Sequence, residues 1–225
     1  MKTLKSYLLN VAVAMILVLT FVPMAFAVPI IWTDWTSATA GYPGSAVGSI
    51  GAIGVTYAGE VAWAQTAGGT NWWTEGSPAP YTGNSVIDNA PPASDIIVVN
   101  VGYITNTITF STPIYDPVMA FVSIGQPSLA VNYNFDTPFT LLSEGQGWWG
   151  DGSWTQSGNT LTGNEAHGAI QFNGLVSSIS WVNTPSEYWH GFTVGSTAAV
   201  PEPATFLLFG AGLAGFGLMK KRFKA

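Results

Sequence analysis

The chain has 225 residues, of which only 8% are charged, and it contains no cysteine. All six Lys and Arg residues lie in the first five or last six positions, so residues 6–219 have no fixed positive charge. Residues 28–199 hold eleven of the twelve acidic residues and carry about eleven negative charges. This charge argues against nucleic acid as a partner. The lack of cysteine excludes a disulfide-stabilised fold.

The N-terminal 27 residues predict a secretory signal peptide. A short basic start is followed by an apolar stretch at 7–22 and then by Ala25-Phe26-Ala27. A basic region, an apolar region and a pair of small residues at the cleavage site are the parts of such a peptide, in that order. We therefore expect a signal helix that is removed by cleavage after Ala27, with Ala25 and Ala27 as the small residues.

The C-terminal residues 200–225 form a tail with three parts. A short motif is followed by an apolar stretch at 204–219 and a basic end. The motif is Val200, Pro201, Glu202 and Pro203, and the basic end contains Lys220, Lys221, Arg222 and Lys224. This tail resembles the PEP-CTERM sorting signal of Gram-negative bacteria, which is also labelled an ice-binding protein C-terminal domain. The resemblance implies recognition by an exosortase, a membrane peptidase that processes proteins bound for the surface or exopolysaccharide matrix.

The apolar stretch at 204–219 predicts a short transmembrane helix. Its sixteen residues would span about 24 Å, less than the ~30 Å hydrocarbon core of a bilayer. Basic residues beside an apolar segment stay on the cytoplasmic side. We therefore expect the domain between the two ends to be exported. The tail would anchor it in the inner membrane until processing, after which it reaches the cell surface or extracellular matrix.

The exported domain, residues 28–199, is the size of one ordinary domain. Short runs of alternating apolar and polar residues are separated by Gly, Pro, Asn and Ser, which is typical of strands. We predict an all-β fold, an antiparallel β-sandwich of the jelly-roll type. The Gly-rich segment 41–59 is either strand or irregular edge, and 77–93 is a long loop. The expected strands are 50–57, 60–66, 95–99, 104–110, 118–124, 129–136, 139–143, 169–173, 178–182 and 191–194.

Two tryptophan-rich loops are the main candidate for a binding site. An indole face stacks on the apolar face of a sugar ring, while neighbouring carboxylates and amides bind the hydroxyl groups. Both loops combine these residue types at expected turns. We therefore predict that they associate with exopolysaccharide, with the alternative that at least one Trp of each pair covers the end of the sandwich. The candidate residues are Trp72, Trp73, Glu75, Trp148, Trp149, Asp151 and Trp154.

A calcium site is a weaker candidate. Asp151, Asn159, Asn164 and Glu165 place oxygen ligands in Gly-rich turns, and no cationic side chain is available to neutralise the carboxylates. The segment Asn132–Asp136 has a similar pattern, but its alternation favours the solvent face of a strand.

Catalytic motifs are absent from the sequence. It contains no nucleophile elbow, no zinc-protease helix motif and no cysteine nucleophile. His167 lies two residues after Glu165, which we interpret as a hydrogen-bonded surface histidine. We therefore expect a non-catalytic structural or exopolysaccharide-associating module without a required cofactor. The alternative is a secreted glycan-cleaving enzyme that uses a pair of carboxylates.

Overall fold

The computed structural model describes residue 27 and residues 29–197. The predicted sorting tail and all of the predicted signal peptide except Ala27 lie outside these residues, as do the two predicted flanking helices. Among the residues described, no helix is long and apolar enough to cross a membrane. The fold therefore concerns the predicted exported domain.

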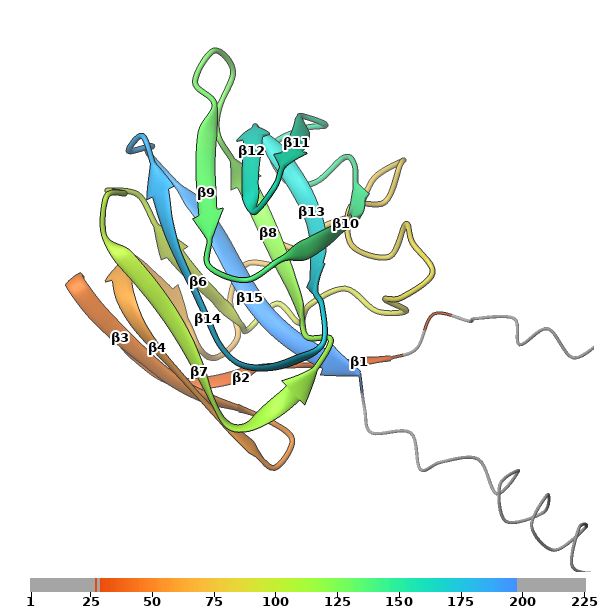
Figure 1. Cartoon of the computed structure of the whole chain (residues 1–225). Helices are drawn as coiled ribbons and strands as arrows, with labels where there is room; N and C mark the ends of the chain where they lie inside the picture. The colour runs from red at the N-terminus through yellow and green to blue at the C-terminus, as the bar shows by residue number, and fades with distance from the viewer. Residues whose placement is uncertain (1–26, 28, 198–225) are drawn as a thin grey trace, which may run out of the picture.

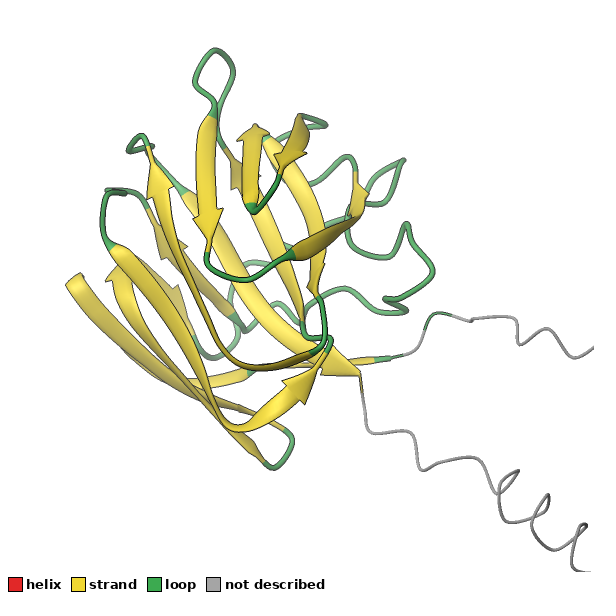
Figure 2. Ribbon diagram, in the orientation of Figure 1, coloured by secondary structure: helices red, strands yellow, loops and turns green. Residues whose placement is uncertain are grey.

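The described residues form fifteen strands joined by turns and loops (Figure 2). The regular secondary structure consists of strands because β-branched and aromatic residues alternate with polar residues in short runs. The strands are β1 (Ile30–Trp32), β2 (Asp34–Thr39), β3 (Gly41–Ile50), β4 (Ile53–Val61), β5 (Trp63–Gln65), β6 (Ile96–Val99), β7 (Thr105–Tyr115), β8 (Val118–Ile124), β9 (Val131–Phe135), β10 (Phe139–Glu144), β11 (Ser153–Ser157), β12 (Thr160–Asn164), β13 (Ala166–Phe172), β14 (Leu175–Thr184) and β15 (His190–Thr197).

Two antiparallel sheets pack face to face (Figure 1). The seven-stranded sheet has the order β10-β13-β8-β15-β6-β5, and β1 pairs with β15. The eight-stranded sheet has the order β11-β12-β9-β14-β7-β4-β3-β2. The predicted all-β antiparallel sandwich is confirmed.

The central strands pair in a nested order. β9 pairs with β12, β8 with β13, β7 with β14 and β6 with β15. This nested order is the pairing expected of a long hairpin folded across two sheets, and the jelly-roll type itself stays a prediction. The connections β6–β7, β8–β9 and β14–β15 consequently lie at one end of the sandwich, which we call the loop end. Strand β1 and the last residues of β15 lie at the opposite end (Figure 1).

Two apolar layers hold the sandwich together. The inner layer lies between the sheets and includes Phe121, Tyr133 and Trp181. The outer layer lies on the other face of the seven-stranded sheet, beneath the long segment 66–95. Strand β8 is buried along its whole length because it contributes to both layers. This double burial explains why β6, and β8 apart from Ser123, are apolar along their length rather than alternating.

The strand predictions differ from the structure mainly at the N-terminal end and after residue 150. The predicted strand 118–124 coincides with β8, whereas the Gly-rich segment 41–59 forms β3 and most of β4. In β3, Gly48 is required by close packing, because a Cβ atom there would lie 2.4 Å from the Asp34 carbonyl oxygen. Strands β1, β2, β11 and β12 were not expected. They are edge or near-edge strands whose weak patterns resemble loops.

Backbone amides hold most of the carboxylates. Seven of the eleven acidic residues of the domain accept at least one backbone N–H, and Glu60 accepts three, from Asn100, Val101 and Gly102. Hydrogen bonds to a charged acceptor are stronger than neutral ones. They replace the ion pairs that a domain without Lys or Arg cannot form. The other six are Glu75, Asp95, Asp116, Asp136, Glu144 and Glu187.

We predict that Glu60→Ala lowers the free energy of unfolding by at least ~2 kcal/mol, because three amides at the loop end lose their charged acceptor. Urea unfolding followed by tryptophan fluorescence measures this loss. Asp88→Ala is the matched control, since it removes the same charge from an exposed side chain. Equal unfolding free energies for the two variants would contradict the structural role of Glu60.

Candidate functional site

The two predicted tryptophan loops bind each other through their backbones. The amide of Gly76 donates to the Gln146 carbonyl over 2.7 Å, and the amide of Gln146 donates to the Pro78 carbonyl over 2.9 Å. The Asn84 side chain adds a bond of 2.9 Å to the Ser143 hydroxyl. Segments separated by some seventy residues in the sequence are therefore fixed side by side.

These loops assemble a cluster of five indole rings. We call Trp63, Trp72, Trp148, Trp149 and Trp189 the tryptophan cluster. The ring centroids of Trp72 and Trp148 lie 5.0 Å apart, those of Trp72 and Trp189 lie 5.1 Å apart, and those of Trp149 and Trp189 lie 6.2 Å apart. Trp63 is 6.1 Å from both Trp72 and Trp189. Such separations are typical of tilted and edge-to-face aromatic contacts.

The cluster is half-buried at its base and exposed at its top. Trp63, Trp72 and Trp189 pack against the outer apolar layer, whereas Trp148 and Trp149 are 41% and 55% exposed. An exposed group of large aromatic side chains supported by a packed base is typical of a binding surface. The loops thus present indole faces to solvent in a fixed arrangement.

Sequence reasoning identified three members of the cluster and missed two. Trp63 lies on β5 and Trp189 immediately precedes β15. Trp189 follows Ser186, Glu187 and Tyr188, so it carried the same signal as the predicted loops: an aromatic pair beside a carboxylate.

The other predicted glycan-binding residues are placed differently. Trp73 is only 2% exposed and its indole N–H donates to the Asp95 carbonyl. Trp154 is buried, and its ring packs against Phe121. Neither ring offers a free stacking face. The Glu75 carboxylate accepts the Tyr81 and Thr82 amides and so holds the loop in shape, while Asp151 is exposed.

His167 lies beneath the second tryptophan loop and is fully buried, so the predicted surface position is wrong. A Cβ atom on Gly147 would lie 2.5 Å from its imidazole ring. The Ser123 amide donates to Nδ1 over 3.3 Å, while the Ser123 hydroxyl donates to Glu165. Burial lowers the pKa of His167 to about 4, because the charged form loses its hydration.

The calcium candidates gain no support from the geometry. Within residues 27 and 29–197, no three His, Cys, Asp or Glu side chains are grouped so as to hold a metal ion. Glu165 accepts the Ser123 hydroxyl, and Asn164 pairs with Ser153 in the sheet. Asn132 and Asn134 lie on the solvent side of β9, where they accept threonine hydroxyls from β12, as the alternation predicts. Calcium is therefore not part of the function proposed below.

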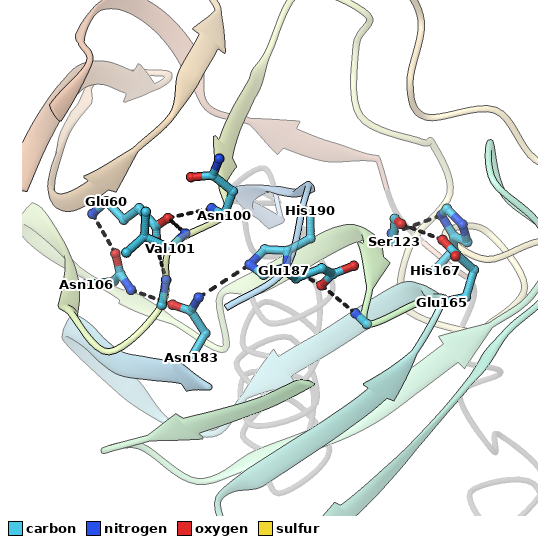
Figure 3. Close-up of polar contacts among 12 residues, drawn as sticks. Glu60, Asn100, Val101, Asn106, Ser123, Glu165, His167, Asn183, Glu187 and His190 are labelled. Carbon is cyan, nitrogen blue, oxygen red and sulfur yellow. Dashed lines mark hydrogen bonds and ion pairs between the residues drawn. The ribbon is translucent and has the colours of Figure 1, made fainter. Parts of the chain in front are cut away.

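A buried polar chain crosses the loop end (Figure 3). The Asn106 amide group donates to the Asn183 oxygen over 2.9 Å, and the Asn183 amide group lies 3.4 Å from His190 Nε2. His190 Nδ1 contacts Glu187 Oε2 over 2.6 Å. If each amide keeps this orientation, His190 Nε2 is an acceptor and Nδ1 carries the proton.

The two ends of this chain hold the three connections of the loop end. Glu60 accepts the amides of the β6–β7 connection, and the Glu60 amide donates to Asn106 over 2.8 Å. Glu187, from the β14–β15 connection, accepts the Gly125 amide of the β8–β9 connection over 2.9 Å. Since every member lies in the interior, the chain fixes the positions of these connections relative to one another.

We predict that acid destabilises the domain through His167. The native state keeps this residue neutral down to about pH 4, whereas the unfolded chain binds a proton near pH 6.5. Its contribution to stability is therefore lost as the pH falls from about 6.5 to about 4, by roughly 3 kcal/mol in total. Urea unfolding of the wild type and of His167→Gln should show this difference in pH dependence. If the unfolding free energies of the two proteins change with pH in parallel, the prediction is wrong.

The comparisons with known proteins concern the C-terminal tail. No curated protein and no solved structure matches the chain. The family model described as the PEP-CTERM protein-sorting motif matches residues 199–222, which lie outside the described residues. The resemblance seen in the sequence is therefore confirmed, and the motif implies processing by an exosortase. The chain thus carries a PEP-CTERM protein-sorting motif, which implies an exported, surface-sorted protein.

Proposed function

We propose that this protein is a non-catalytic component of the cell surface or extracellular matrix whose tryptophan cluster binds exopolysaccharide. The observation that carries the proposal is the convergence of five indole rings from four separate segments onto one supported surface. Export and exosortase sorting, which the tail implies, deliver the domain to the place where such polymers accumulate.

The chemistry of the cluster suits sugar rings. Trp148 and Trp149 are 41% and 55% exposed, so both offer apolar indole surface to solvent. Sugar rings present apolar C–H faces, and stacking against an indole removes both surfaces from water. Because the rings are already held by aromatic neighbours, little conformational entropy is lost on binding.

The charge of the domain restricts the ligand to an uncharged polysaccharide. Residues 28–199 hold eleven acidic residues and no Lys or Arg. A polymer rich in uronate, sulfate or phosphate groups would meet net repulsion without any cationic side chain to bind it. A neutral polymer meets no such penalty.

The hydrogen bonds of Glu75 favour binding over cleavage. Among the predicted carboxylates of the two loops, Glu75 is committed to the Tyr81 and Thr82 amides. Glycoside hydrolysis needs two available carboxyl groups on either side of the bond. We therefore retain glycan cleavage only as the alternative outcome of the experiment below.

We predict that Trp149→Ala weakens binding to the purified neutral exopolysaccharide of the producing cell at least tenfold, because the variant loses its most exposed indole face. Affinity electrophoresis measures the change. The melting temperature should stay the same, since more than half of this side chain is exposed. Tyr115→Ala, which removes a 68% exposed aromatic ring from the opposite end of the domain, is the control and should bind normally.

Unchanged binding by Trp149→Ala would remove the cluster from the proposal. Release of new reducing ends from the polymer by the wild-type protein would favour the glycan-cleaving alternative. A protein that neither binds nor cleaves would have a purely structural role.

Salt and polymer charge give a second prediction. Affinity for the neutral polymer should change less than twofold between about 20 and 500 mM NaCl, because no charge pair contributes to it. A uronate-rich polymer of similar length should not bind. Tighter binding of the uronate polymer, or a steep loss of affinity for the neutral one with salt, would show that the ligand class is wrong.

A further inference from the structure

A groove of about 600 Å³ opens at the loop end, and its lining residue Tyr188 directly precedes Trp189 of the tryptophan cluster. Its walls come from the β6–β7, β8–β9 and β14–β15 connections. Tyr103 and Tyr188 are aromatic members of its lining, and they are 68% and 86% exposed. Asn100, Gln126 and Ser186 add amide and hydroxyl groups to the lining. Aromatic faces next to hydrogen-bonding groups are the combination that binds sugars.

The groove is rigid because Glu60 and Glu187 of the buried polar chain bind the backbone of its walls (Figure 3). Glu60 fixes the backbone amides of the first wall, which includes Asn100 and Val101. The Gly125 amide of the second wall donates to Glu187, which belongs to the third. The Glu187 amide in turn donates to the Asn100 carbonyl over 3.0 Å. Walls held in this way form a site without reorganisation on binding.

One connection joins the groove to the tryptophan cluster. Tyr188 lines the groove, and the next residue, Trp189, belongs to the cluster. Consecutive Cα atoms lie only about 3.8 Å apart. A ligand lying across the β14–β15 connection therefore meets both aromatic surfaces, whereas a short ligand occupies only one.

We propose that the groove is a second carbohydrate subsite, and that the domain recognises the interior of an uncharged polysaccharide that extends from the tryptophan cluster across the β14–β15 connection into the groove. This inference rests on the function proposed above. Engagement of two neighbouring subsites by one chain raises the affinity for long chains above that for short fragments.

The test compares chain lengths. The neutral exopolysaccharide and the short oligosaccharides released from it by partial acid hydrolysis are titrated against the full chain, with affinities expressed per binding site. The wild type should bind the polymer at least tenfold more tightly than the fragments. Tyr188→Ala should lose most of the additional affinity for the polymer and keep wild-type affinity for the fragments. A second variant, Tyr103→Ala, should behave in the same way.

The controls separate this inference from the proposed function. Tyr103 and Tyr115 lie near the two ends of β7 and are equally exposed, so Tyr115→Ala should match the wild type for both ligands. Trp149→Ala should weaken binding of polymer and fragments alike. If Tyr188→Ala and Tyr103→Ala bind the polymer as the wild type does while Trp149→Ala does not, the groove is not a subsite and the proposed function stands. If the wild type binds neither ligand, both proposals fail.

Discussion

The lack of cationic side chains between residues 6 and 219 is the constraint on which the rest of the structure depends. A buried or half-buried carboxylate needs a compensating partner, and here most of these partners are backbone amides. Glu60 and Glu187 illustrate the consequence. Each lies in the interior of the loop end, and each accepts amides from a connection distant in the sequence. Burial of these carboxylates costs hydration free energy on folding, but their hydrogen bonds to backbone amides fix the shape of the loops. In a domain with ordinary salt bridges, Lys and Arg side chains could pair with the same carboxylates without ordering the backbone.

The same constraint extends to function. A surface without Lys or Arg has no strong means of binding anionic polymers. Recognition must then depend on apolar faces and uncharged hydrogen-bonding groups. The tryptophan cluster supplies the former, and its base is built into the outer apolar layer rather than into mobile side chains. The groove beside it is shaped by the carboxylate–amide bonds of the loop end. Fold stability and ligand class are thus two consequences of one compositional feature.

The sequence predicted the class of fold and part of the candidate site, for identifiable reasons. A strand that is buried on one face shows alternating apolar and polar residues. A strand that is buried on both faces, such as β8, is apolar along most of its length. Either pattern can be recognised from the local sequence alone. Edge strands such as β2 and β11 have no such pattern. The partnership of Trp72 with Trp148 depends on backbone bonds between two loops, and that of Trp63 with Trp189 on the pairing of sheet strands. Trp154 is the one buried residue of β11, so this short strand shows no alternation from which its burial could be predicted. His167 was misplaced because burial beneath a glycine-rich loop leaves no local signal.

The dependence of stability on ionic strength tests the central claim most directly. If the domain contains like charges and no attraction between charged side chains, adding NaCl from about 10 to 200 mM at pH 7 screens only repulsion between carboxylates. The melting temperature should therefore rise steadily over this range, because the amide–carboxylate bonds in the interior are little affected by screening. A fall in melting temperature over the same range would show that attraction between exposed charges holds the domain together, and it would contradict the account.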